Sequence, residues 1–159
     1  MKAIIADSST LIVLLDTNNF SLLFKLFEEI LISDEVYKEI TYKFDHKTII
    51  EEHILSNVLQ VHSAENGDLY EMLIKRLDKG ESESIILAKK LALPLIIDEK
   101  KGRSIARSLD IVIIGFVGIL LKLLEKNIIQ KEQAIRIVKD AEKNDFRLSD
   151  ALKKMVIEY

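Results

Sequence analysis

Four acidic side chains are the strongest candidates for chemistry in this sequence: Asp7, Glu39, Glu83 and Asp98. Hard divalent cations such as Mg²⁺ and Mn²⁺ prefer oxygen ligands, and carboxylates supply them. Carboxylates that share a cleft repel each other and raise one another's pKa unless a cation joins them. A metal held in this way activates a water and stabilises the charge that develops at a phosphodiester. The residue types therefore suit metal-dependent phosphodiester hydrolysis.

Each acid also has a purely structural interpretation. An acid directly after a strand, as at Asp7 and Asp98, can start a turn or cap a helix. Glu81 and Glu83 fall in the first turn of an expected helix, where acids interact favourably with the helix dipole. Glu39 is expected on a helix surface, where a carboxylate is usually just solvated. Spacing alone leaves both interpretations open, and on that basis alone the metal site is the less favoured.

The elements that must position these acids are clearest between Gly80 and Gly118, which reads as helix, strand, helix and strand. Leu93–Ile97 is apolar on both alternate faces, as expected of a central parallel strand, and it stops at Asp98. Lys2–Ala6 is a second β-type run that stops at Asp7. Ligands of open α/β sheets bind outside the carboxyl ends of the strands. Both acids are expected at that edge if their strands are parallel near-neighbours.

Helices alternate with strands through the rest of the chain. We expect further strands at Leu31–Ile32, Val58–Val61 and Ile111–Ile114, and helical segments at Leu11–Leu15, Leu22–Ile30, Asp34–Tyr42, Asp45–Leu55, Asp68–Leu77, Phe116–Leu124, Gln130–Lys143 and Ser149–Glu158. Such alternation predicts an α/β fold with a central parallel sheet of about four to five strands and right-handed crossovers.

Composition limits the class of protein that this sequence can form. With 159 residues, 48% of them hydrophobic, and only one Pro and five Gly, the chain suits a single domain, residues 1–159, with an ample core. The lack of Cys excludes disulfides and thiolate metal sites. No secretory signal and no apolar run of about 20 residues is present, so we expect a cytoplasmic protein with no membrane partner. His46, His53 and His62 lack metal-ligand spacing and are expected at the surface or in loops.

A basic segment follows Asp98. Lys100, Lys101, Arg103 and Arg107 lie in an expected helix, and the two arginines, four residues apart, share one face. Beside a metal site they could hold backbone phosphates, which dominate nucleic-acid affinity without reading sequence. The alternative is a solvated face with ion pairs to Glu99 and Asp110. The net charge of −3 argues against a basic surface over the whole molecule.

Several short motifs, taken in order, resemble those of PIN-domain nucleases, including the VapC-like toxins. They are IIADSS at 4–9, SDEVYKEI at 33–40, GESESIILA at 80–88, LIIDEKKGRSIAR at 95–107, IIGFVGILL at 113–121 and DFRLS at 145–149. Each motif alone is weak, but their order and spacing together are fairly specific, and they cover most of the chain.

The resemblance implies a PIN-like three-layer α/β fold, Mg²⁺ or Mn²⁺ as cofactor, and endonucleolytic cleavage of RNA. It makes Asp7, Glu39, Glu83 and Asp98 the catalytic acids, with Asp7, Glu83 and Asp98 as metal ligands. Ser9 matches a position that typically supports the first acid. Many relatives are toxins held inactive by a small antitoxin protein, and many dimerise, so an antitoxin partner and a homodimer are implied as well.

The sequence departs from the family pattern at three places. The usual Asp-Asp pair is Asp98-Glu99 here, and the Gly-Thr after the last strand is Gly115-Phe116, which removes a hydroxyl contact. Glu81 competes with Glu83, which we favour because the small and apolar residues after it fall in the family's register. We therefore carry two functions forward: a metal-dependent endoribonuclease of the toxin type, and a non-catalytic PIN-like module that binds RNA or protein.

Overall fold

A five-stranded parallel sheet forms the centre of the computed structural model, which describes residues 2–159. The strands are β1 (Ala3–Ala6), β2 (Glu29–Ser33), β3 (Leu59–His62), β4 (Leu95–Ile96) and β5 (Ile113–Ile114). Their order across the sheet is β3-β2-β1-β4-β5, and every neighbouring pair is parallel. The expected α/β fold with four to five parallel strands is confirmed.

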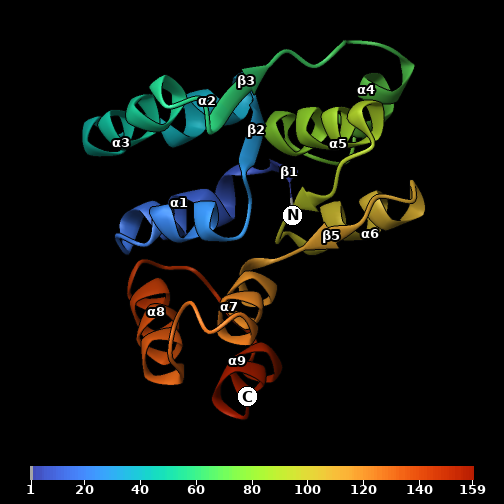
Figure 1. The fold of residues 1–159 in the computed structure, drawn as a ribbon. Helices are drawn as coiled ribbons and strands as arrows, with labels where there is room; N and C mark the ends of the chain where they lie inside the picture. Colours follow the sequence, from blue (N-terminus) through green and yellow to red (C-terminus); the bar gives the residue numbers. More distant parts are fainter. Residues whose placement is uncertain (1) are drawn as a thin grey trace.

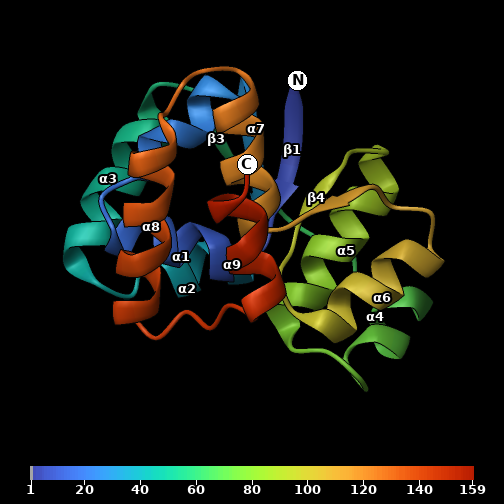
Figure 2. The same ribbon diagram turned by 90° about the horizontal axis from the view of Figure 1, so that it is seen from below.

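Helices cover both faces of this sheet and give three layers (Figure 1 and Figure 2). One face is covered by α4 (Asp68–Leu73), α5 (Lys79–Leu91) and α6 (Lys100–Ser108). The other side carries α1 (Ser8–Asp16), the 3₁₀ helix η1 (Phe20–Lys25), α2 (Asp34–Ile40), α3 (Phe44–Leu55), α7 (Phe116–Glu125), α8 (Lys131–Lys143) and α9 (Asp150–Ile157). The three-layer arrangement implied by the resemblance is therefore present.

Each face of the sheet has its own hydrophobic core, because side chains of a strand alternate between its two faces. Ile4 and Ala6 of β1 belong to the larger core under α1, α7 and α8. Ile5 points the other way, into a second core that includes Ile85 and Leu87 of α5. Covering both faces explains why the central strands are apolar throughout.

The strand register brings two of the predicted acids to one edge. Ala6 of β1 pairs with Ile96 of β4, and the Asp7 amide donates a 2.9 Å hydrogen bond to the Ile96 carbonyl. Because β1 and β4 are adjacent and parallel, Asp7 and Asp98 both leave the sheet at its carboxyl edge. The sequence predicted both acids at one edge provided that their strands are parallel neighbours, and β1 and β4 are.

Some expected boundaries were wrong. The helical spacing from Leu22 to Ile30 does not produce one helix: η1 ends at Lys25, and Ile30 lies in β2, fully buried and paired with Ile4. Pairing with the central strand outweighs helical propensity over so short a segment. The fourth strand spans only Leu95–Ile96 rather than Leu93–Ile97, and α4 ends at Leu73 rather than Leu77.

The expected surface position of His46 was also wrong. This side chain is buried, and its Nε2 lies 3.2 Å from Asp16 Oδ1. The acceptor at the end of α1 lies far away in sequence, so local spacing gave no sign of it. Among residues 2–159, no helix combines the length and apolar character needed to cross a bilayer.

We predict that Ile5→Ala, in the central strand, lowers the free energy of unfolding by about 2–5 kcal/mol, because it leaves a cavity in a fully buried position. Ile157→Ala, at a side chain that is 53% exposed, should change it by less than about 0.5 kcal/mol. Urea unfolding measures both values. Equal effects of the two variants would contradict the assignment of β1 to the centre of the fold.

Candidate active site

Asp7 lies at the start of α1 with its carboxylate almost fully buried. Only 3% of the residue is exposed, its side chain makes no cap hydrogen bond, and Oδ1 has no hydrogen-bond partner. Burial, opposed by a hydrogen bond from the Ser8 amide and assisted by the charges of Asp78, Glu39 and Asp98, raises the pKa of Asp7 from 3.8 to about 7. A buried carboxylate without a partner is costly to keep charged, and a bound cation would offset that cost.

Glu39, from the last turn of α2, meets Asp7 across Gly80 of α5. A β-carbon at Gly80 would overlap Glu39 Oε1 and would lie 3.6 Å from Asp7 Oδ1, so the missing side chain leaves room for both carboxylates. Glu39 Oε1 is buried without a partner, while Oε2 accepts a 3.4 Å hydrogen bond from the Ser8 hydroxyl. Burial, then the charges of Asp78 and Glu35, raise the pKa of Glu39 to about 7.

Asp98 borders the same cluster, but both of its oxygens are already engaged. Oδ1 accepts a 2.8 Å hydrogen bond from the Phe116 amide, and Oδ2 accepts one from the Thr10 hydroxyl. Burial raises the pKa of Asp98, while these two hydrogen bonds and the charge of Arg103 oppose that rise. Thr10 thus supplies to this acid a hydroxyl contact of the kind expected to be lost at Phe116.

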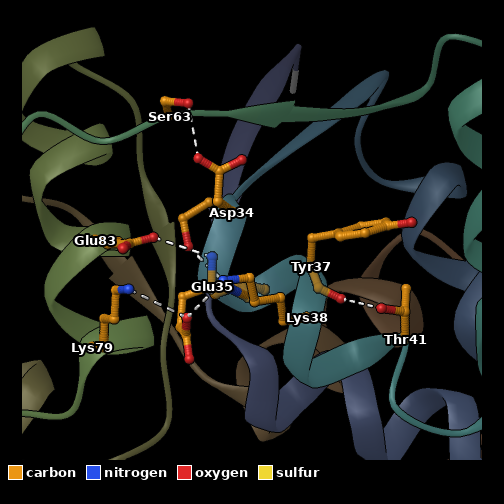
Figure 3. A network of polar contacts seen from close by, with 10 residues as sticks. Asp34, Glu35, Tyr37, Lys38, Thr41, Ser63, Lys79 and Glu83 are labelled. Carbon is orange, nitrogen blue, oxygen red and sulfur yellow. Dashed lines mark hydrogen bonds and ion pairs between the residues drawn. The ribbon is translucent and has the colours of Figure 1, made fainter.

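Glu83 lies farther along α5 and faces the start of α2 (Figure 3). Its Oε1 accepts a 3.2 Å hydrogen bond from the Glu35 amide, and the residue is 7% exposed. Lys79 lies beside it, with Nζ 3.7 Å from Glu35 Oε2. The charge of Glu83 contributes to the raised pKa of Glu39, so the two acids are neighbours. As placed here, Glu83 stabilises the N-terminus of α2.

Asp78 is an acid of this cluster that sequence reasoning missed. It caps α5 in a capping box with Glu81: the Glu81 amide donates to Asp78 Oδ1 at 2.8 Å, and the Asp78 amide donates to Glu81 Oε1 at 3.2 Å. Its charge raises the pKa values of Asp7 and Glu39. The spacing Asp-x-x-Glu before an apolar run was a detectable signal of this cap.

The hydroxyls that contact the acids are those on either side of Ser9. Ser8 donates to Glu39 and Thr10 donates to Asp98. Ser9 itself is half-buried, and within residues 2–159 its hydroxyl makes no hydrogen bond. Ser9 was expected to support Asp7, whereas the hydroxyls of its two neighbours contact Glu39 and Asp98.

The first residue after Asp98 caps α6, and basic residues follow it along that helix. Glu99 caps α6, with Oε2 accepting a 2.7 Å hydrogen bond from the Gly102 amide. Arg103 is half-buried, and a β-carbon at Gly115 would lie 2.8 Å from its Nη1 and 2.9 Å from Asp98 Oδ1. Lys100 and Arg107 are exposed. Arg103 is thus the cation of α6 that reaches the acid cluster.

The carboxylates fit a divalent cation only in part. Over residues 2–159, no three Asp, Glu or His side chains are close enough together to hold one ion. Glu83 and Asp98 are turned toward protein donors, whereas Asp7 Oδ1, Glu39 Oε1 and Glu81 Oε2 are buried without a partner. Glu81 Oε2 lies against Gly102 of α6, whereas the other two oxygens meet at Gly80. Oxygen donors of this kind are those that Mg²⁺ and Mn²⁺ prefer. The pair Asp7 and Glu39 is therefore the part of the cluster that fits a metal.

The chain is an α/β module with buried acids at the carboxyl edge of its parallel sheet, which is the edge where ligands of such folds bind. Residues 3–159 match the family described as DUF3368, PIN domain, and the chain belongs to that PIN-domain family. Among solved structures, it is similar to a PilT N-terminus domain protein from the hyperthermophilic archaeon Sulfolobus solfataricus P2. That match has 23% identity and a TM-score of 0.50 and covers 79% of this chain and 95% of the other, which supports the fold. No curated protein matches the chain.

We predict that Gly80→Ala lowers Mn²⁺ affinity by roughly tenfold or more, because the added methyl group displaces the Glu39 carboxylate. The fold should persist, since the displaced atoms end a flexible side chain. Gly67→Ala is the matched control, because its β-carbon would meet nothing within 4 Å. Isothermal titration with Mn²⁺ compares the two variants. Equal Mn²⁺ affinity in both would show that Glu39 does not contribute to metal binding.

The raised pKa values also predict a pH dependence of stability without metal. The ordinary pKa values of Asp7 and Glu39 are 3.8 and 4.5, and in the folded chain both are about 7. At pH values between these limits, the folded chain therefore binds more protons at the two groups than the unfolded chain does. These groups therefore lower the free energy of unfolding as the pH rises from about 4 to about 7, and the loss then levels off.

Urea unfolding with a chelator present, at about pH 5 and about pH 8, measures this loss. Asp7→Asn should make the difference in the free energy of unfolding between the two pH values smaller, whereas Asp140→Asn, at an acid of α8 whose side chain is 51% exposed, should leave it unchanged. The predicted coupling is wrong if Asp7→Asn and wild type show the same difference.

Proposed function

We propose that this protein is a metal-dependent endoribonuclease. The observation that carries the proposal is the buried pair Asp7 Oδ1 and Glu39 Oε1, two carboxylate oxygens with no donor that meet across Gly80. Buried side-chain oxygens without a hydrogen-bond partner are rare in folded proteins, and a bound cation would account for these two. Membership of the PIN-domain family, whose modules are nuclease-like, supports the same reading.

Asp7 and Glu39 would hold Mg²⁺ or Mn²⁺, and Asp98 and Glu83 stay predicted members of the catalytic set. The bound ion supplies an activated water and compensates the charge that develops on the phosphodiester. Ser8 and Thr10 hold the carboxylates of Glu39 and Asp98 in place. Gly80 keeps the space between Asp7 and Glu39 open.

Arg103 is the residue we propose to hold the substrate phosphate nearest the acids. It lies beside Asp98 at the gap left by Gly115. A guanidinium matches phosphate geometry with two parallel donors. Lys100 and Arg107 are exposed on the same helix and would extend this contact along the strand of RNA.

The proposal includes a toxin role, with a small antitoxin protein as partner and a homodimer as the assembled state. Its support is the family resemblance of the motifs around Asp7, Glu83 and Asp98. The sequence of the adjoining gene and the mass of the purified protein in solution test these two partners separately from the chemistry.

A second function is favoured by one specific observation. Both oxygens of Asp98 and one of Glu83 are used in hydrogen bonds that hold α1, α2 and α7 in place, as in a scaffold. This arrangement suits a non-catalytic PIN-like module that binds RNA or protein. Such a module would bind its ligand equally well with and without a chelator.

The test of the proposed function is cleavage of a structured RNA by purified protein. We expect cleavage by wild type with Mn²⁺, none with EDTA, and a loss of at least about a hundredfold in Asp7→Asn with Mn²⁺. Asp140→Asn should retain the wild-type rate, since its carboxylate lies on the exposed face of α8.

Two outcomes would contradict the proposal. RNA binding without cleavage in any metal would favour the non-catalytic module. Equal cleavage by wild type and Asp7→Asn, or cleavage that persists in EDTA, would show that the activity does not come from this cluster.

A further inference from the structure

A hollow of about 460 Å³ opens beside Glu39, next to the acid cluster and outside the roles assigned so far. It is lined by Ile12, Lys38, Glu39, Tyr42, Lys43 and His46, from α1, α2, the α2–α3 connection and α3. Its volume is in the range of small-ligand sites. Because Glu39 belongs to both, whatever occupies the hollow is adjacent to the acids.

Tyr42 is the most unusual residue of this hollow. It lies two residues after the end of α2 and is 90% exposed, although large aromatic side chains normally bury most of their surface. An exposed ring at the wall of a cavity offers a flat face to a flat ligand. Aromatic side chains placed in this way stack on the bases of single-stranded nucleic acids.

Two lysines and a histidine line the same hollow as Tyr42. Lys43 Nζ and His46 Nε2 lie 3.1 Å and 3.2 Å from the same atom, Asp16 Oδ1, so Asp16 fixes both at the wall of the hollow. Lys38 is 70% exposed, and its nearest acid is Glu35 at 4.0 Å, which leaves its ammonium group available. The acid that lines the hollow is Glu39, which the proposed metal would neutralise; Asp16 does not line it and is paired with Lys43.

We propose that this hollow is a subsite for one nucleotide of a single-stranded substrate, with the base stacked on Tyr42 and the adjoining phosphate held by Lys38 and Lys43. The inference rests on the proposed function, because it places that nucleotide next to the phosphodiester at the acid cluster. A nucleotide joins a flat apolar ring to a negative charge, and the hollow pairs an exposed aromatic ring with two cations. A base inside a duplex is stacked on its neighbours, so only an unpaired base reaches Tyr42.

The direct test is the binding of a short, fluorescein-labelled single-stranded oligoribonucleotide, followed by fluorescence anisotropy. Asp7→Asn with Mn²⁺ serves as the parent, so that cleavage does not interfere. Adding Tyr42→Ala should weaken binding by roughly tenfold, which is about 1.4 kcal/mol. Adding Tyr42→Phe should leave binding close to the parent, because stacking needs the ring and not the hydroxyl.

Phe44→Ala is the matched control. This ring is 81% exposed and lies two residues away, but it does not line the hollow. A second pair of variants tests the contribution of charge. Lys38→Ala should reduce the magnitude of the slope of log affinity against log salt by about 0.7. Lys47→Ala, on the exposed surface of α3, is its control and should not change the slope.

The inference and the proposed function fail in different experiments. Equal binding by the Tyr42→Ala and Phe44→Ala variants would overturn the subsite while metal-dependent cleavage by wild type stood. A change from dimer to monomer in Tyr42→Ala, with RNA binding unchanged, would assign this surface to contact between copies and would also overturn it. Loss of binding in Tyr42→Ala with no cleavage by wild type would support the subsite and contradict the nuclease.

Discussion

The meeting of two carboxylates, Asp7 and Glu39, inside the protein is the interaction on which the rest of this structure depends. Each has a buried oxygen without a donor, and each has a pKa raised to about 7. Burying charge without compensation costs several kcal/mol, and carboxylates that share a site repel each other. The fold nevertheless holds them together: β1 fixes Asp7, α2 carries Glu39, and Gly80 leaves the space between them. A divalent cation removes the cost, whereas protonation removes it only at lower pH.

The other acids of the cluster carry out a different task. Asp98, Glu83 and Glu99 accept backbone hydrogen bonds from Phe116, Glu35 and Gly102, and so fix the starts of α7, α2 and α6 at the edge of the sheet. Helix starts carry unpaired amide groups and a partial positive charge, which acidic side chains satisfy. These acids therefore divide into Asp7 and Glu39, which we propose bind a cation, and Asp98, Glu83 and Glu99, which accept hydrogen bonds from the backbone.

Much of this could be predicted from the sequence, because strand ends are visible in it. Apolar runs that stop at Asp7 and Asp98 indicated a parallel sheet with both acids at one edge, and the register of β1 and β4 confirms it. Rotamers and long-range partners could not be predicted. The sequence around Asp98 does not show that Thr10 donates to it from 88 positions away. The sequence around His46 likewise does not show that this side chain lies against Asp16. The role of Asp78 was visible as a capping box, but its effect on Asp7 depends on tertiary packing.

The central claim is that Asp7 and Glu39 form a site that exchanges protons for a divalent cation. Isothermal titration of Mn²⁺ at about pH 6.5, in buffers of different ionisation enthalpy, measures the protons released on binding. We predict that protons are released at this pH, that fewer are released at about pH 8.5, and that Asp7→Asn abolishes most of the release. Mn²⁺ binding without proton release, or no Mn²⁺ binding by wild type at either pH, would contradict the account.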